Sequence, residues 1–258
     1  MPAADSAFIT VQGRKLEYQL IPATRAVAPV LVFLHEGLGS ISLWRNFPQQ
    51  VAAATGCAVL VYSRYGYGQS DVLESPRQVE YMHREGLDAL PELLARLSIN
   101  KPVLVGHSDG ASIALIHAGT HPAVRAVVAL APHVFVEDIS VKSIAEAKTA
   151  FETTDLPQKL ARHHADSAKT FYGWNDIWLH PDFRAWNIEA YLPSIRCPVM
   201  AVQGIDDEYG SMAQLEAIAA QAGGTVELVK LAACKHTPHR DQPEATLAAI
   251  ARFVGSLR

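Results

Sequence analysis

Short apolar runs alternate with longer segments of helical periodicity along most of this chain. Most of the runs are rich in valine, leucine and isoleucine, and their continuous apolar character predicts strands buried on both faces of a sheet. The predicted strands are residues 8–11, 16–21, 30–35, 58–62, 103–105, 123–130, 198–204 and 225–231. The predicted helices among them are residues 43–54, 77–97 and 243–257. This alternation is typical of an α/β fold with a mostly parallel, doubly wound sheet.

One long segment, residues 136–193, interrupts the alternation. Its pattern is helical, and it is too long for a simple crossover between two strands. The helices predicted within it are residues 139–153, 156–167 and 183–191. The segment holds three of the four tryptophans of the chain, which form either the core of a small module or one wall of a ligand pocket. We therefore predict a core of residues 1–135 and 194–258 that carries residues 136–193 as a helical insertion.

The apolar strand at 103–105 runs directly into the sequence Gly-His-Ser-Asp-Gly at positions 106–110, followed by a helix of small residues. This is the G-x-S-x-G pattern, in which a tight turn between strand and helix exposes the serine side chain in a strained conformation. The serine then lies at a helix N-terminus, whose free amides favour developing negative charge. Ser108 is therefore the candidate nucleophile.

A nucleophilic serine needs a base and an orienting acid, and both candidates follow later strands. The strand at 198–204 leads into Asp206 and Asp207, and the strand at 225–231 leads to His236. The chain order of serine, acid and histidine is the order found with the G-x-S-x-G turn. Over essentially its whole length, the chain resembles the α/β-hydrolase family of serine hydrolases.

The resemblance assigns the remaining parts of this triad. The family acid is usually the third residue after the glycine that ends the strand, which here is Gly204, and this selects Asp207 with Asp206 as the alternative. His236 matches the histidine of the family ending Gly-His-x-x-x-x-Glu-x-Pro-Glu, read here from Lys235 to Glu244. The resemblance also implies that the helical insertion is a cap, placed after strand six and over the serine.

Two backbone amides are expected to form an oxyanion hole, because charge develops on the carbonyl oxygen under attack. The resemblance places one donor at Asp109, after the nucleophile, and the other at Gly37. Glu36 stands where the family usually has glycine, and it is expected either to pair beneath the loop or to contact substrate or a catalytic water. The Asp109 side chain either complements the dipole of its helix or borders the pocket. The candidate pocket residues are Glu36, His107, Trp174, Trp178, Trp186 and His239.

Composition and charge exclude several other classes. The net charge of −4 and the absence of a Lys/Arg run argue against nucleic acid as a partner. Neither a signal-like N-terminus nor an apolar membrane span is evident, so we expect a soluble, cytoplasmic protein without a membrane partner. The histidine pairs His117/His121 and His163/His164 lack a third ligand at a recognisable spacing, so neither a metal nor another cofactor is expected. Assembly into a homo-oligomer stays open.

The expected activity is hydrolysis of a small carboxylic ester, thioester or lactone through an acyl-enzyme, with a small-molecule substrate as the partner. Three alternatives stay open at this stage. A hydrolase of carbon–carbon bonds in ring-cleavage products uses the same triad, although the loop at 36–39 lacks its usual Gly-Pro-Gly run. A cofactor-free perhydrolase also shares the triad. Some members of the fold act instead as small-molecule sensors with a nearly idle triad.

Overall fold

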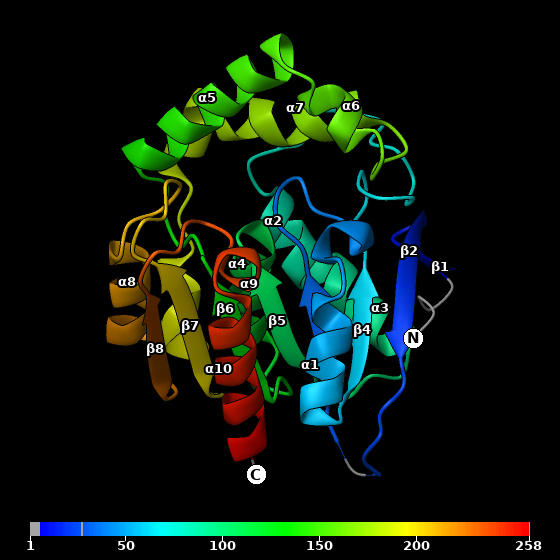
Figure 1. The fold of residues 1–258 in the computed structure, drawn as a ribbon, viewed down its shortest axis with the longest axis vertical. Helices are drawn as coiled ribbons and strands as arrows, with labels where there is room; N and C mark the ends of the chain where they lie inside the picture. The colour runs from blue at the N-terminus through cyan, green and yellow to red at the C-terminus, as the bar shows by residue number, and fades with distance from the viewer. Residues whose placement is uncertain (1–5, 27, 258) are drawn as a thin grey trace.

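The computed structural model describes residues 6–26 and 28–257 and shows the predicted mixed sheet (Figure 1). Its eight strands lie in the order β1-β2-β4-β3-β5-β6-β7-β8. The β1/β2 and β2/β4 pairs are antiparallel and every other neighbouring pair is parallel. The strands are β1 Ala7–Val11, β2 Arg14–Ile21, β3 Val30–Leu34, β4 Ala58–Tyr62, β5 Val103–His107, β6 Ala126–Leu130, β7 Val199–Gly204 and β8 Val226–Leu231. The predicted fold class, an α/β-hydrolase fold with a helical insertion after β6, is confirmed.

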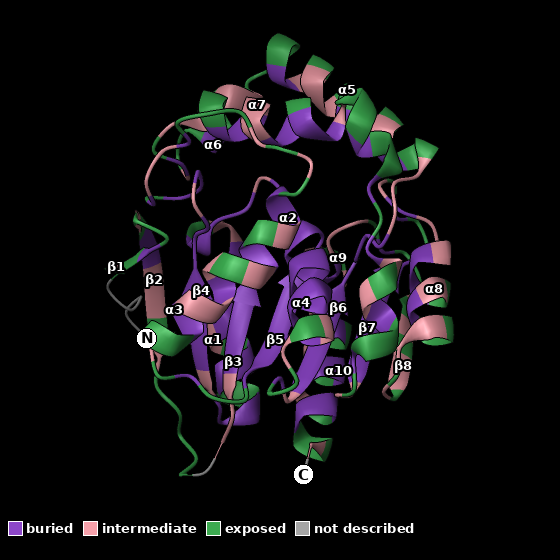
Figure 2. Cartoon of the chain, turned by 180° about the vertical axis from the view of Figure 1, so that it is seen from behind, coloured by how far each residue is buried: buried purple, intermediate pink, exposed green. Residues whose placement is uncertain are grey.

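Helices cover both faces of the sheet, as the continuous apolar strands require. The helices of the core are α1 Phe47–Thr55, α2 Tyr81–Arg84, α3 Leu90–Arg96, α4 Asp109–Thr120, α8 Ala213–Gln221, α9 Pro238–Asp241 and α10 Pro243–Ser256. Successive residues of a strand point to opposite faces. Leu31 and Phe33 of β3 therefore join the core beneath α1 and α10, whereas Val32 and Leu34 join the core on the α4 face. Figure 2 shows the central strands buried between these layers.

Three elements of the core differ from the sequence prediction. The predicted helix at 43–54 begins only at Phe47, because Arg45 adopts a positive φ of 54° that a helix cannot contain. The predicted helix at 77–97 begins at Tyr81 and includes a π-helical turn, Glu85–Ala89, between α2 and α3. Strand β6 begins at Ala126 rather than 123, because the residues before it form a turn in which the amide of Val124 donates to His121.

The insertion after β6 consists of α5 Asp138–Thr153, α6 Leu156–Leu160 and α7 Ser167–Trp178, followed by two short 3-10 turns, Pro181–Ala185 and Glu189–Ser194. These three helices lie above the carboxyl ends of the parallel strands (Figure 1). The predicted helix at 156–167 was wrong, because α6 ends at Leu160 and α7 starts afresh at Ser167 with the Asp166 side chain as its N-cap. The predicted helix at 183–191 was also wrong, since the two 3-10 turns replace it.

Candidate active site

Ser108 lies at the sharp turn between β5 and α4, with φ 52° and ψ −119°. A non-glycine residue adopts a positive φ only under constraint, and strain of this kind is common at functional sites. Both flanking glycines are required by close backbone approach. A Cβ on Gly106 would lie 2.3 Å from the Gly110 carbonyl oxygen, and a Cβ on Gly110 would lie 2.1 Å from that of Leu34. The packing of the turn therefore accounts for the small residues predicted on both sides of the serine.

The structure brings Ser108, His236 and Asp207 together from three separate loops. The Ser108 Oγ hydroxyl lies 2.9 Å from His236 Nε2. On the other side of the ring, His236 Nδ1 lies 2.9 and 3.0 Å from the two carboxylate oxygens of Asp207. Asp206, the alternative acid, is exposed, and its backbone amide bonds to Cys234. A chain of hydrogen bonds thus runs from the Ser108 hydroxyl through the His236 imidazole to the Asp207 carboxylate.

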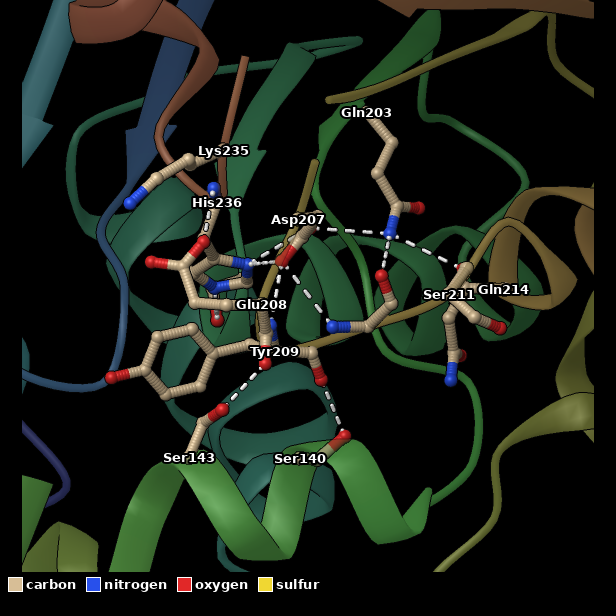
Figure 3. Close-up of polar contacts among 12 residues, drawn as sticks. Ser140, Ser143, Gln203, Asp207, Glu208, Tyr209, Ser211, Gln214, Lys235 and His236 are labelled. Carbon is tan, nitrogen blue, oxygen red and sulfur yellow. Dashed lines mark hydrogen bonds and ion pairs between the residues drawn. The ribbon is translucent and has the colours of Figure 1, made fainter. Parts of the chain in front are cut away.

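The loop after β7 holds the Asp207 carboxylate by several further hydrogen bonds (Figure 3). Its Oδ1 accepts from the amides of Tyr209 and Gly210 at 2.8 and 3.2 Å, and its Oδ2 accepts from Gln203 Nε2 at 3.1 Å. Burial opposes ionisation of Asp207, but the contact with His236 and the amide of Tyr209 outweigh it and lower its pKa. Gln203 was not predicted as a site residue. The available signal was a glutamine next to the last residue of an otherwise apolar buried strand.

The His236 imidazole is set to remain basic despite its burial. Burial alone would lower its pKa, but the Asp207 carboxylate, with smaller contributions from Glu208 and Glu36, raises the pKa above its usual value. Glu208 also contacts the backbone, because its Oε2 accepts the amide of His236 at 3.2 Å. The arrangement can therefore take a proton from Ser108 and stabilise the imidazolium that results.

Gly37 and Asp109, the predicted oxyanion donors, both border the cavity that contains Ser108. Within residues 6–26 and 28–257, neither amide donates to another protein atom. The indole of Trp174 from α7 packs directly on Gly37, where an added Cβ would lie 2.0 Å from Nε1. A side chain at position 37 would therefore displace this indole.

The side chain of Asp109 is fully buried, and its Oδ2 accepts the hydroxyl of Tyr81 at 2.6 Å. The Nη2 atom of Arg64 lies 4.0 Å from the same oxygen. The carboxylate is thus part of a buried polar network in addition to lying in the first turn of α4.

Glu36 pairs with an imidazole and also lines the cavity. Its Oε2 lies 3.4 Å from His107 Nδ1, and its side chain remains 21% exposed. Burial opposes its ionisation, but the contact with the His107 imidazole holds the Glu36 pKa well below its usual range. His107 in turn donates from Nε2 to the carbonyl oxygen of His236 at 2.7 Å. The Glu36–His107 pair therefore also braces the backbone of the candidate base.

The cavity over Ser108 has a volume of about 340 Å³ and is roofed by Ile144, Trp174 and Trp178 from the insertion. Four of the predicted pocket residues line it, namely Glu36, His107, Trp174 and Trp178. The other two are absent from its walls. Trp186 stacks on Phe183 at 5.5 Å between ring centroids, and His239 packs against Trp44 at 4.6 Å. Both rings therefore pack against other aromatic side chains and do not line the cavity.

Seven residues that line the cavity were not predicted, namely Leu38, His133, Ile144, Glu208, Tyr209, Thr237 and Arg240. Tyr209 and Arg240 lie close in sequence to Asp207 and His236, so their proximity to those residues was the available signal. His133 follows β6, and its ring lies 5.6 Å from that of His236. Burial and the neighbouring His236 lower the pKa of His133 to about 3, so its ring is neutral.

The histidine pairs that raised the question of a metal take part in packing. His117 bonds through Nδ1 to the carbonyl of Gly86, and His164 accepts the amide of Gly68 and donates to the carbonyl of Leu38. The described residues contain no group of three or more His, Cys, Asp or Glu side chains placed to hold a metal ion. Among the helices of that same part of the chain, none is long and apolar enough to cross a membrane.

Residues 31–250 match the sequence family described as the Alpha/beta hydrolase family. The chain therefore belongs to the alpha/beta hydrolase family, as the predicted resemblance indicated.

A curated relative, the sn-1-specific diacylglycerol lipase ABHD11 of Danio rerio, is 30% identical over 175 residues. The match covers 64% of this chain and 51% of the relative, so the chain spans about half the length of that protein.

Solved structures show the same fold at low sequence identity. Proline iminopeptidase of Mycobacterium smegmatis superposes with a TM-score of 0.78 at 18% identity, covering 97% of this chain and 98% of that one. The enol-lactonase of Burkholderia xenovorans LB400 superposes with a TM-score of 0.76 at 20% identity, covering 97% of this chain and 100% of that one. At these identities the likeness establishes the fold.

Proposed function

We propose that this protein is a serine hydrolase that cleaves a small carboxylic ester, thioester or lactone through an acyl-enzyme. The observation that carries the proposal is the continuous hydrogen-bonded chain from Ser108 through His236 to Asp207, with heavy-atom distances of 2.9 to 3.0 Å. These distances meet the geometric requirement for a nucleophile, a general base and an orienting group. The serine also separates this protein from hydrolases of the fold that use aspartate as nucleophile.

Acylation follows from the positions of these groups. His236 Nε2 takes the Ser108 proton as Oγ attacks the substrate carbonyl carbon, and Asp207 stabilises the imidazolium through Nδ1–H. The carbonyl oxygen becomes an oxyanion, which the amides of Gly37 and Asp109 receive. Collapse of the tetrahedral intermediate expels the alkoxide or thiolate leaving group, which takes the proton from His236. The acyl group remains on Ser108.

Deacylation repeats these steps with water as nucleophile. His236 removes a proton from the water as it attacks the acyl carbon, and the proton then returns to Ser108 Oγ when the acid leaves. The overall reaction consumes one water and restores the enzyme.

The cavity supports a small substrate with an apolar group. Its volume of about 340 Å³ is at the lower end for ligand pockets. Trp174, Trp178 and Ile144 offer apolar surface on the side of the insertion, whereas Glu208 and Arg240 add charge. A lipase among the relatives and a lactonase among the structural neighbours support an ester-type bond as the target.

We expect steady, multiple-turnover hydrolysis when the purified protein is given a panel of short p-nitrophenyl esters, acyl thioesters and lactones. The Ser108→Ala variant, measured at the same concentration, gives the background rate. Turnover that stops after one equivalent of product would indicate a sensor. Activity confined to vinylogous diketones would indicate a carbon–carbon hydrolase, and peroxide-dependent halogenation without ester turnover would indicate a perhydrolase.

The pH profile of hydrolysis should report His236. The base must be neutral, and its pKa is raised, so kcat/KM should fall as the pH drops through a midpoint above 6.5. The Glu208 carboxylate contributes to this rise, so Glu208→Gln should move the midpoint to lower pH, with the plateau rate retained. Asp206→Asn, which removes the charge of a nearby exposed acid, serves as the control and should leave the midpoint in place. An unmoved midpoint in Glu208→Gln would contradict this electrostatic role.

A further inference from the structure

The loop that follows β4 buries a cation that the proposed chemistry does not use. Arg64 belongs to the segment Ser63–Ser70, and its side chain is fully buried. A guanidinium is costly to bury unless it is hydrogen bonded, so its partners indicate what its burial achieves. The nearest carboxylate oxygen that pairs with it is Asp109 Oδ2, at 4.0 Å, which is beyond hydrogen-bonding distance.

The close partners of Arg64 are carbonyl oxygens of the oxyanion loop. Its Nη2 donates to the carbonyl of Glu36 at 3.0 Å and to the carbonyl of His35 at 3.1 Å. Both carbonyls belong to the segment that leads into Gly37. A charge-assisted hydrogen bond of this kind is stronger than one between neutral groups.

His35 supplies a second donor to the same carbonyl. The backbone amide of Arg64 donates to His35 Nε2 at 3.0 Å, so Nε2 carries no proton and the proton lies on Nδ1. His35 Nδ1–H then donates to the carbonyl of Glu36 at 2.7 Å. Burial, together with the adjacent Arg64 charge, holds the His35 pKa well below its usual range, so the ring keeps this tautomer.

The peptide that joins Glu36 to Gly37 transmits this constraint. The described residues contain no cis peptide bond, and a trans peptide is planar, so its N–H points away from its carbonyl oxygen. The Glu36 oxygen is held by these two side-chain donors and by the backbone amide of Gly39 at 3.0 Å, so the Gly37 N–H must point to the opposite side. A donor on the carbonyl also polarises the peptide and makes its N–H a better donor.

We propose that Arg64 is a positioning residue for the oxyanion hole, which together with His35 clamps the Glu36 carbonyl and so aims the amide of Gly37 at the developing oxyanion. The proposal rests on the proposed hydrolase function. Arg64 is not among the residues that line the cavity over Ser108. It acts on the transition state through the orientation of a single peptide.

The first test is Arg64→Met, which keeps an apolar stem and removes the guanidinium. We expect kcat to fall by about 10- to 10²-fold with KM little changed, because deleting a whole oxyanion donor costs about 10²–10³ and here the amide remains but is less well held. The rate at which a fluorophosphonate labels Ser108 should fall in parallel, because its phosphoryl oxygen occupies the same hole. Arg77→Met is the matched control and should stay within about threefold of wild type, since Arg77 bonds the carbonyl of Tyr65 instead.

The second test does not depend on the folding of Arg64→Met. In His35→Asn the side-chain amide nitrogen can replace the Nδ1 donor, whereas in His35→Gln the side-chain oxygen can replace only the Nε2 acceptor. The clamp requires the donor, so His35→Asn should retain more of the wild-type kcat and labelling rate than His35→Gln. A role in stability alone would instead make kcat independent of which substitution is present once both proteins are folded.

The results of these tests distinguish failure of the proposed positioning role of Arg64 from failure of the proposed hydrolase function. A folded Arg64→Met with kcat and labelling within about threefold of wild type, or with a loss confined to KM, would overturn the clamp. The reverse order of the two His35 variants would overturn it as well. A wild-type protein that hydrolyses no ester but still loses Ser108 labelling in Arg64→Met would overturn the hydrolase function and leave the clamp supported.

Discussion

Ser108→Ala should lower kcat for any ester that the wild-type protein hydrolyses by about 10⁴- to 10⁶-fold, as losing the nucleophile does in other triad enzymes. The hydroxyl forms the covalent bond, so no neighbouring group replaces it. His236→Ala should cost a similar amount, because without the base the hydroxyl stays protonated and is a weak nucleophile. The double variant should be no slower than either single variant, since the residues act as one unit.

The measurement is steady-state hydrolysis of a p-nitrophenyl ester, with fluorophosphonate labelling as an independent count of active serines. Wild-type protein should be labelled at one serine, and Ser108→Ala should not be labelled. Ser75→Ala and His180→Ala are suitable controls, because both side chains lie outside the active-site cavity. Undiminished hydrolysis by purified Ser108→Ala would show that Ser108 is not the nucleophile.

The parts of the site that the sequence predicted are those fixed by local chain geometry. The elbow around Ser108 needs glycine at positions 106 and 110 because two backbones nearly touch there. The acid and the base follow parallel strands, whose carboxyl ends meet at one edge of a sheet. A pattern of a few consecutive residues predicted Ser108, whereas the chain order and the family resemblance selected Asp207 and His236, which the structure brings next to it.

The insertion was predicted less well, because distant contacts decide where its helices stop. Residues 161–166 could have continued α6, but His164 instead accepts the amide of Gly68 and donates to the carbonyl of Leu38. Both partners lie about a hundred residues away in the chain, so no local pattern reveals them. Helix α7, which supplies Trp174 and Trp178 to the cavity, begins only after this turn.

Aromatic and polar residues inside the site also escaped assignment from sequence. Composition identified a group of tryptophans but not the direction of each ring, so Trp186 was placed with the two that line the cavity. Arg64 lies in a loop with two nearby glycines, Gly66 and Gly68, and only its burial against the Glu36 carbonyl connects it with Gly37. Side-chain direction in such cases depends on which loops lie next to each other in the folded chain.

The choice between the two adjacent acids gives the second large effect. Asp207→Asn should lower kcat by about 10²- to 10⁴-fold, whereas Asp206→Asn should stay within about threefold of wild type. Asp206 is exposed, whereas both carboxylate oxygens of Asp207 lie within hydrogen-bonding distance of His236 Nδ1. The two variants differ by one position and remove the same charge, so each is the control for the other.

The size of the Asp207→Asn effect follows from the donors around the carboxylate. The amides of Tyr209 and Gly210 donate to the Oδ1 position, so an asparagine would place its oxygen there and its NH₂ at the Oδ2 position. That NH₂ would face His236 Nδ1 at about the 3.0 Å now spanned by Oδ2, next to the asparagine oxygen at about 2.9 Å. The NH₂ favours the tautomer with its proton on Nε2, which cannot accept the Ser108 proton, and the neutral oxygen stabilises the productive tautomer and the imidazolium less than a carboxylate does.

The measurement is kcat of Asp207→Asn and of Asp206→Asn on the same ester at the same pH, with both proteins folded. The same asparagine NH₂ would also face the NH₂ of Gln203, which now donates to Oδ2, so thermal melting must accompany the kinetics. A loss of kcat in Asp207→Asn that persists well below its melting temperature reflects the tautomer rather than unfolding. If Asp206→Asn is the more damaging change while both proteins remain folded, the exposed acid must reach His236 in solution and the assignment of Asp207 is reversed.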